Sequence, residues 1–266
     1  MAARTEAPKF GSFVLGAASG VTILDWRDRI LHRARYTDRM KGDGALLVAD
    51  KYTGRSITIT GRVQGSDSGD AKDKMDDVLE NFANSEQYLQ FYDDRKILAR
   101  LSRNVDISFV KGTSGATIGF RASFRSRWPT YQAAAATTDS FTPSGTGPND
   151  MVTSSIGGEA ATFPKITLTN STTGFTDKQV TLTNLSTGKQ LVLSGFSMAN
   201  GDAIVVDMRE GRIGDGTTVP TYPRSRSGQW WSLTNGATQT IQLEHDVGSG
   251  ASWAVAVAYS AQHWQF

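Results

Sequence analysis

The sequence predicts a mainly β fold with one helix, in two domains. Short runs of alternating apolar and polar residues recur along most of the chain, as half-buried strands require. Only the stretch 70–84 repeats its apolar residues at helical spacing. Residues 132–162, rich in Ala, Ser, Thr, Gly and Pro, separate two strand-rich halves. We therefore expect a first domain at 1–131, a linker or excursion at 132–162, and a β-sandwich domain at 163–266.

Composition narrows the classes of function. The 266 residues include no cysteine, which excludes a disulfide framework and a thiolate metal site. The net charge of +2 combines unlike halves: residues 1–131 carry 21 basic and 16 acidic side chains, and residues 132–266 carry 7 and 10. This asymmetry suits steering between stacked copies, and neither half has the concentrated basic stripe of a dedicated nucleic-acid domain. The uncharged run 10–24 contains three glycines and is too short for a membrane span of roughly 20 residues, so no membrane insertion is expected.

The first strands are expected between residues 10 and 64. Apolar runs at 10–15 and 21–26 flank a glycine-punctuated segment and predict a hairpin. In residues 27–39, arginines alternate with aspartates, which favours a solvated or subunit-facing strand edge over a phosphate site. Residues 41–44 are expected to form a loop. From 55 to 64, apolar and polar residues alternate strictly, as in a half-buried strand.

The helix is predicted at 70–84. Asp70 is the expected N-cap, and Met75, Val78, Leu79 and Phe82 recur at helical spacing so that they can cover a sheet. Carboxylates can collect hard cations, but here they fall opposite this stripe, where a solvated face is the preferred interpretation. These acids are Asp73, Asp76, Asp77 and Glu80.

The last strand of the first domain carries a stripe of arginines. Apolar residues occupy the even positions 118–124, while Arg121, Arg125 and Arg127 fall on the other face. The stripe would be roughly 20 Å long at the rise of a strand. It fits a charged interface, the lining of a DNA passage or a plain solvent face, and base-specific reading of DNA is not favoured.

The second half reads as successive short strands. Residues 166–174 and 180–188 repeat the pattern ITLTNSTTG and VTLTNLSTG, which predicts two arms of a meander. Trp230 and Trp231 would point to opposite faces of a strand, so that one is expected in the core and the other exposed. An exposed tryptophan could act as a platform for a sugar ring.

Catalytic patterns are sparse. His32, His245 and His263 lie far apart without ligand spacing, and no nucleophile elbow or phosphate-binding glycine loop occurs. We expect no catalytic residue, no cofactor and no metal, and hence no enzyme.

The order of these parts resembles that of siphophage distal tail proteins. The segments that carry the resemblance are ITITGRVQG (57–65), RASFRSRWPTY (121–131), LSGFSMANGDAIVVDMREGRI (193–213) and QWWSLTNGATQTIQLEHD (229–246). The resemblance implies a tail-tube-like β-barrel or sandwich with a flanking helix, followed by a galectin-like or jelly-roll β-sandwich.

The resemblance also implies a structural virion protein. Such a protein forms a homo-hexameric ring at the distal end of a long non-contractile tail, after synthesis in the host cytoplasm. The ring joins the tail-tube protein to the hub, fibre or tape-measure protein, and DNA passes through its lumen without sequence-specific binding. Candidate ring or stacking contacts are Arg33, Arg35, Arg39, Lys41, Arg121, Arg125 and Arg127. The alternative is a carbohydrate-binding adhesion module with Trp230 or Trp231 as its platform.

Overall fold

The computed structural model describes residues 7–38, 45–83, 85–92, 94–110, 113, 115–143, 147–171, 174–215, 225–247 and 253–264. The fold is mainly β with one α-helix, as predicted. The chain forms two compact units, residues 1–134 with 264–266 and residues 135–263.

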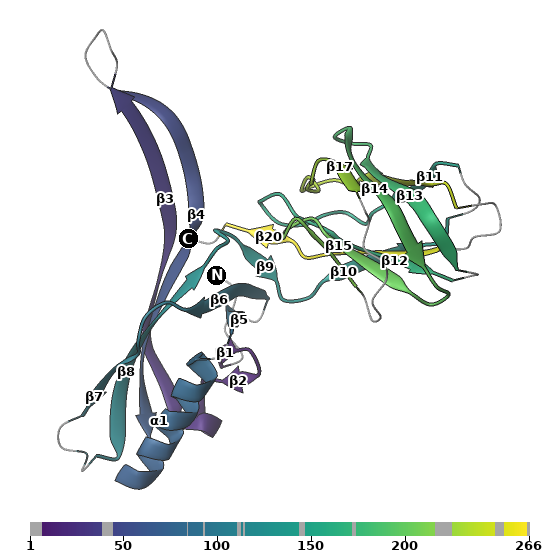
Figure 1. Ribbon diagram of the computed structural model, residues 1–266. Coiled ribbons are helices and arrows are strands. Elements are labelled where there is room, and N and C mark those ends of the chain that lie inside the picture. Colours follow the sequence, from purple (N-terminus) through teal and green to yellow (C-terminus); the bar gives the residue numbers. More distant parts are fainter. Residues whose placement is uncertain are drawn as a thin grey trace. The chain divides into compact units, whose positions relative to one another are not determined.

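The first unit contains a twisted antiparallel sheet and the helix (Figure 1). Its strands follow one another in space as β2-β1-β5-β6-β8-β4-β3, with β7 beside β8 and β9 beside β6. The elements are β1 (Lys9–Phe10), β2 (Phe13–Val14), the 3-10 turn η1 (Ala17–Ser19), β3 (Val21–Asp38), β4 (Ala45–Gln64), α1 (Ser68–Ala83), β5 (Gln87–Tyr92), β6 (Arg95–Leu101), β7 (Asp106–Phe109), β8 (Thr117–Ser126) and β9 (Tyr131–Ala133).

Strands β3 and β4 form a long hairpin that extends beyond the rest of the first unit (Figure 1). The hairpin predicted between residues 10–15 and 21–26 is wrong, because β1 pairs with β2 and with β5, whereas β3 pairs with β4. The turn η1 ends at Gly20 in the left-handed conformation (φ 66°), which directs the chain into the longer ladder with β4.

The helix begins two residues earlier than predicted, and Asp67 rather than Asp70 is its cap. Asp67 Oδ1 accepts hydrogen bonds from the backbone N–H groups of Gly69 (2.8 Å) and Asp70 (3.0 Å). The Asp70 carboxylate in turn accepts from the N–H of Ser66 at 2.7 Å. Both carboxylates thus satisfy backbone donors at the start of the helix.

One face of α1 closes the core of the first unit. Ala71, Met75, Val78 and Phe82 are buried, Leu79 is half-buried, and the four acids that were expected on the solvent face are exposed. The Phe82 ring packs against Phe10 on β1 and against Phe120 and Phe124 on β8, at centroid distances of 5.7, 6.1 and 5.0 Å. This aromatic cluster joins the helix to β1 and β8 of the sheet.

The second unit is a sandwich of two five-stranded antiparallel sheets, ordered β10-β19-β12-β15-β16 and β11-β18-β13-β14-β17 (Figure 1). Residues from both sheets form one apolar core, which includes Ile204, Val206, Trp253 and Val257. The strands of the sandwich are β10 (Thr137–Phe141), β11 (Asn149–Val152), β12 (Lys165–Asn170), β13 (Phe175–Asn184), β14 (Lys189–Met198), β15 (Ala203–Asp207), β16 (Arg212–Asp215), β17 (Ser225–Gly228), β18 (Thr240–His245) and β19 (Trp253–Tyr259). The short strand β20 (Gln262–His263) belongs to neither of these two sheets.

Two sequence-based predictions about the second half are corrected. Much of the segment 132–162 is not a linker: β10 pairs with β19 and β11 pairs with β18, one strand in each sheet. Met151 and Ile156 are buried in the core, although Ser, Thr and Gly around them hide the alternation. The repeated segments do not form a meander either, because β12 and β13 lie in opposite sheets.

Candidate functional site

Strands β3, β4, β8 and β7 expose one face of their sheet, and the cross-strand register orders its side chains in rows. Arg29, Ser56, Arg125 and Arg100 are consecutive partners across β3, β4, β8 and β6. Two residues further along, Arg27, Thr58 and Ser123 form the next row. The third row is Asp25, Thr60, Arg121 and Asp106. We call this surface the arginine face.

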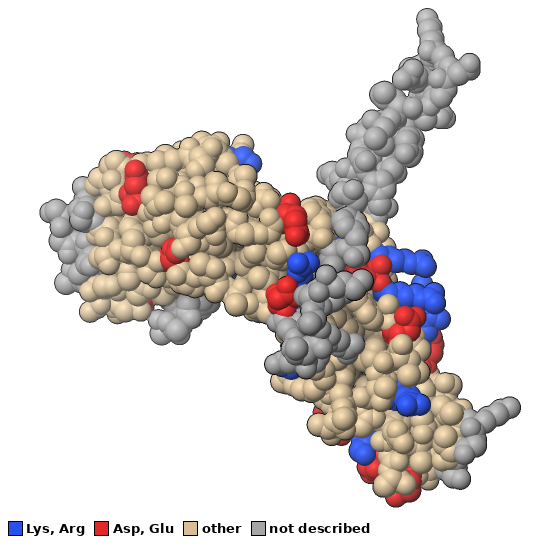
Figure 2. Space-filling model, turned by 180° about the vertical axis from the view of Figure 1, so that it is seen from behind, with Lys and Arg blue, Asp and Glu red and all other residues tan. Residues whose placement is uncertain are grey.

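The arginine face is more basic than the sequence indicated. Residues 121–127 alone suggested a stripe, but register adds arginines from neighbouring strands, and the aspartates on the face are fewer. Five arginines of the face make no ion pair or hydrogen bond with a described side chain: Arg29, Arg62, Arg100, Arg121 and Arg125. Figure 2 shows Lys and Arg gathered on the first unit, whereas the second unit is mostly uncharged in that view.

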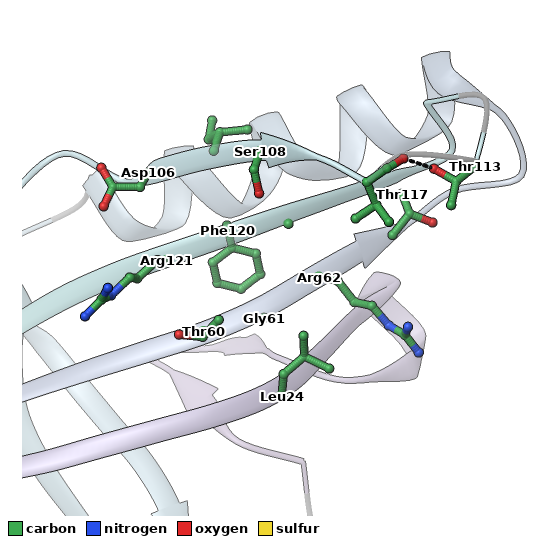
Figure 3. A pocket seen from close by; sticks show the side chains of 13 residues that line it. Leu24, Thr60, Gly61, Arg62, Asp106, Ser108, Thr113, Thr117, Phe120 and Arg121 are labelled. Atoms are coloured by element: carbon green, nitrogen blue, oxygen red, sulfur yellow. Dashed lines mark hydrogen bonds between the residues drawn. The ribbon is translucent and has the colours of Figure 1, made fainter.

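A groove of about 480 Å³ hollows one end of the arginine face (Figure 3). Its floor lies at Gly61 and Gly119, where a side chain would collide: a Cβ on Gly119 would lie 2.9 Å from Ser108 Oγ. Leu24 and Ile107 supply apolar walls, and Arg62, Asp106 and Arg121 stand at its rim. The groove therefore combines an apolar surface with the guanidinium groups of Arg62 and Arg121, neither of which is paired with another described side chain.

The edge strand β7 lies beside this groove and is unusually apolar for an exposed edge. All four of its residues are exposed, including Ile107 (46%) and Phe109 (73%). Val110 (41%) and Leu24 (60%) extend the patch. Among the described strands, β7 pairs only with β8 and β3 pairs only with β4, so both ends of this four-stranded order have open edges. An open strand edge with exposed apolar residues is a surface on which a further strand can pair.

The predicted interface arginines fall in two groups. Arg121 and Arg125 lie on β8, inside the sheet rather than at its edge, and Arg127 follows β8 and forms an ion pair with Glu86 (3.1 Å). Arg100, Arg125 and Arg127 line a second hollow of about 920 Å³. Arg33 and Arg35 lie in β3, where the structure describes only the backbone, and Arg39 and Lys41 lie outside the described residues.

A buried ion pair at the base of the hairpin was not predicted. Arg55 on β4 is 1% exposed and forms an ion pair with Asp28 on β3. Its Nε donates to the carbonyl of Pro129 at 2.9 Å, and its guanidinium lies 4.8 Å from the ring centroid of Tyr131, whose hydroxyl donates to Asp28 at 3.0 Å. Burial raises the pKa of Asp28, and the charge of Arg55 and the hydrogen bonds from Arg55 and Tyr131 counteract it only in part.

The tryptophan predictions are partly confirmed. Trp231 is 1% exposed and belongs to the core, so its assignment as a sugar platform is wrong. Trp230 is half-buried, and the guanidinium of Arg226 covers its ring at 4.7 Å from the centroid. A sugar ring could not stack on that face without displacing Arg226.

The polar clusters of the second unit are structural. The Asp139 carboxylate accepts hydrogen bonds from Ser154 N and Oγ (2.7 Å each) and from Tyr259 (2.8 Å). Burial and the carboxylate raise the pKa of Tyr259 to about 12. His245 is buried with Nδ1 3.2 Å from the Val247 carbonyl oxygen, and His263 Nδ1 lies 3.2 Å from Glu159. Across the described ranges, no three His, Asp or Glu side chains are placed to hold a metal ion.

Comparisons with known proteins give the class of the fold. No protein-family model and no curated protein sequence matches the chain. Solved structures do match along both units, and they are proteins of phage hubs and baseplates. The chain has the fold of a phage distal tail or baseplate hub protein, which confirms the resemblance predicted from the sequence at the level of the fold.

Three solved structures define the likeness. The SPP1 Dit protein, described as a paradigm of the hub adsorption apparatus in phages that infect Gram-positive bacteria, aligns with a TM-score of 0.63 and 14% identity, over 96% of this chain and 98% of that chain. Two structures of the phage P2 baseplate in its activated conformation, with Ca and with Sr, align with a TM-score of 0.51 each, at 11% and 10% identity, over 92% of both chains. In the described part of the chain, the one helix is too short and too polar to cross a membrane.

Proposed function

We propose that this chain is a structural virion protein that forms a ring at the distal end of a long non-contractile phage tail. The observation that carries the proposal is the structural match to SPP1 Dit, which spans nearly the full length of both chains. The ring joins the tail-tube protein to the hub, fibre or tape-measure protein, and DNA passes through its lumen. The role is assembly rather than catalysis.

Strand direction supports a ring of identical copies. Strands β3, β4, β8 and β7 are antiparallel to their neighbours, so the two edge strands β3 and β7 run in opposite directions. When copies are placed side by side in the same orientation, β7 of one meets β3 of the next in the antiparallel sense. A sheet of this kind continues from copy to copy and leaves no open edge once the ring closes.

Side chains at the edge support the same contact. Ile107 and Phe109 on β7 are exposed in a single copy, and pairing with the next copy would remove them from water. We assign ring contacts to these edges, and ring or stacking contacts to the hairpin segment with Arg33, Arg35, Arg39 and Lys41. Six copies, as the resemblance implies, is the expected number.

Electron microscopy and light scattering of the purified chain test this function. We expect rings with a central hole, and a compact monomer at high concentration, with or without the tail-tube protein, would contradict the proposal. The variant I107K/F109K should remain monomeric, because it charges the β7 edge. The matched control V152K/L185K charges two exposed apolar residues of the second unit and should still form rings. If I107K/F109K assembles as well as the wild type, β7 does not lie in the interface.

A further inference from the structure

We propose that the arginine face binds the phosphate backbone of double-stranded nucleic acid through sequence-neutral contacts. The inference rests on the proposed function in one respect: a DNA passage would bring the duplex to this face. The surface itself is defined by register and charge in a single copy.

The first argument is the state of the arginines. Arg29, Arg62, Arg100, Arg121 and Arg125 have no ion-pair or hydrogen-bond partner among the described side chains. Arg27 is paired with Asp25 at 3.2 Å on the same face, and Asp106 lies opposite Arg121 in the ladder. Among the described side chains, the face therefore keeps an excess of guanidinium groups without an acidic partner, each able to make two parallel hydrogen bonds to one phosphate.

The second argument is what lies between the arginines. The intervening positions on β4 and β8 are Ser56, Thr58, Thr60 and Ser123, and the hydroxyls of Thr58 and Ser123 lie 3.4 Å apart. Hydroxyl groups and arginines are the side chains that contact phosphate oxygens without reading bases. No aromatic residue lies on these rows to stack on an unpaired base, so the surface suits a duplex rather than a single strand.

The third argument is geometry. Arg121 and Arg125 are four residues apart on one strand, which separates their Cα atoms by about 13 Å. Arg29, Arg125 and Arg100 form a row across the strands, and neighbouring strands lie about 5 Å apart. The charges are therefore spread in two dimensions over a broad face, as contact with a wide polyanion requires, and they do not converge on a small anion.

An acidic protein segment is the competing ligand of this face. Carboxylates would also pair with the free guanidinium groups. An ionised carboxylate accepts from serine and threonine hydroxyls as a phosphodiester oxygen does, so the hydroxyl rows serve either ligand. The spread of the arginines over a broad face, from β3 to β6, is what favours a duplex.

Binding of a fluorescently labelled duplex DNA of mixed sequence to the full chain, followed by anisotropy at several salt concentrations, tests the proposal. We expect affinity to fall with salt and to be equal for two unrelated sequences. The variant R121Q/R125Q should reduce the slope of log K against log salt by about 2, or about 1 for each lost phosphate contact. The matched control R103Q/R212Q removes two exposed arginines outside the face, and it should keep the wild-type slope.

Three results would overturn the proposal: wild-type slope and affinity in R121Q/R125Q, an equal loss in R103Q/R212Q, or tighter binding of poly-glutamate than of DNA. Light scattering of the same samples measures the oligomeric state, so that failure of DNA binding can be distinguished from failure of ring formation. A chain that stays monomeric yet loses DNA binding in R121Q/R125Q refutes the ring and supports the phosphate-binding face. A chain that forms rings but does not bind DNA supports the ring and refutes the phosphate-binding face.

Discussion

The buried pair between Asp28 and Arg55 gives the sharpest prediction about stability. The change Asp28→Asn keeps the shape of the side chain but leaves the Arg55 guanidinium, 1% exposed, without its counter-charge. Removal of one partner from a buried pair costs about 3–5 kcal/mol, and the asparagine can still accept hydrogen bonds from Arg55 and Tyr131. We therefore expect a loss of about 3 kcal/mol in the free energy of unfolding of the first unit.

The matched control is Asp25→Asn on the same strand. Asp25 pairs with Arg27 at 3.2 Å, but both side chains are more than half exposed, so the loss should stay below about 1 kcal/mol. Urea unfolding is monitored by hydrogen exchange of peptides from β4 and β8. This measurement gives the free energy of unfolding of the first unit separately from that of the second. If Asp28→Asn and Asp25→Asn differ by less than about 1 kcal/mol, the reasoning from burial is refuted. The double variant D28L/R55M should be more stable than Asp28→Asn, because it leaves no unpaired charge.

Three further predictions concern the ladder irregularity at Gly54 in β4, the helix cap and pH. Gly54 has φ 136°, and a Cβ there would lie 2.2 Å from the Ser126 carbonyl oxygen, so Gly54→Ala should cost about 3 kcal/mol by urea unfolding. At Gly201 (φ 87°) nothing lies within 4 Å of a Cβ, and Gly201→Ala should cost only about 1 kcal/mol. Asp67→Ala should speed hydrogen exchange in the first turn of α1, whereas Asp73→Ala, on the exposed face, should not. Partial burial opposes ionisation of Asp139, but hydrogen bonds from Ser154 and Tyr259 outweigh it and hold its pKa below the usual 3.8. The second unit should therefore keep this stabilisation above pH 3.8 and lose it as pH falls through the lowered pKa, and thermal unfolding of Asp139→Asn should lack this dependence.

Local patterns in the sequence were sufficient to predict the elements in which buried side chains recur at the regular spacing of a strand or a helix. The alternation in β8 and the stripe of α1 correspond to buried residues such as Phe124 and Phe82 because each element packs a single face. The strand β19 follows the same rule, because Trp253, Val255 and Val257 on one face are buried. In these elements the side-chain period is set by backbone geometry alone.

Pairing between distant strands could not be predicted in this way. The segment that became β10 and β11 has few apolar residues, and its place in the sandwich depends on β19 and β18, about a hundred residues later. The arginine face has the same origin: Arg29, Arg100 and Arg125 come from three strands, and only the register brings them into one row. The Asp28–Arg55 pair was hidden because charged residues in strands usually face water. Trp231 could not be distinguished from Trp230 because adjacent residues offer equal hydrophobicity to either face.

The position of Arg55 has a mechanical consequence for the first unit. Its guanidinium connects Asp28 on β3 with the carbonyl of Pro129, the point where the chain leaves β8 towards β9. One buried side chain thus holds the hairpin and the segment between β8 and β9 together. A displacement of Arg55 would therefore release both segments at once, because Asp28 would lose its counter-charge and the Pro129 carbonyl its donor.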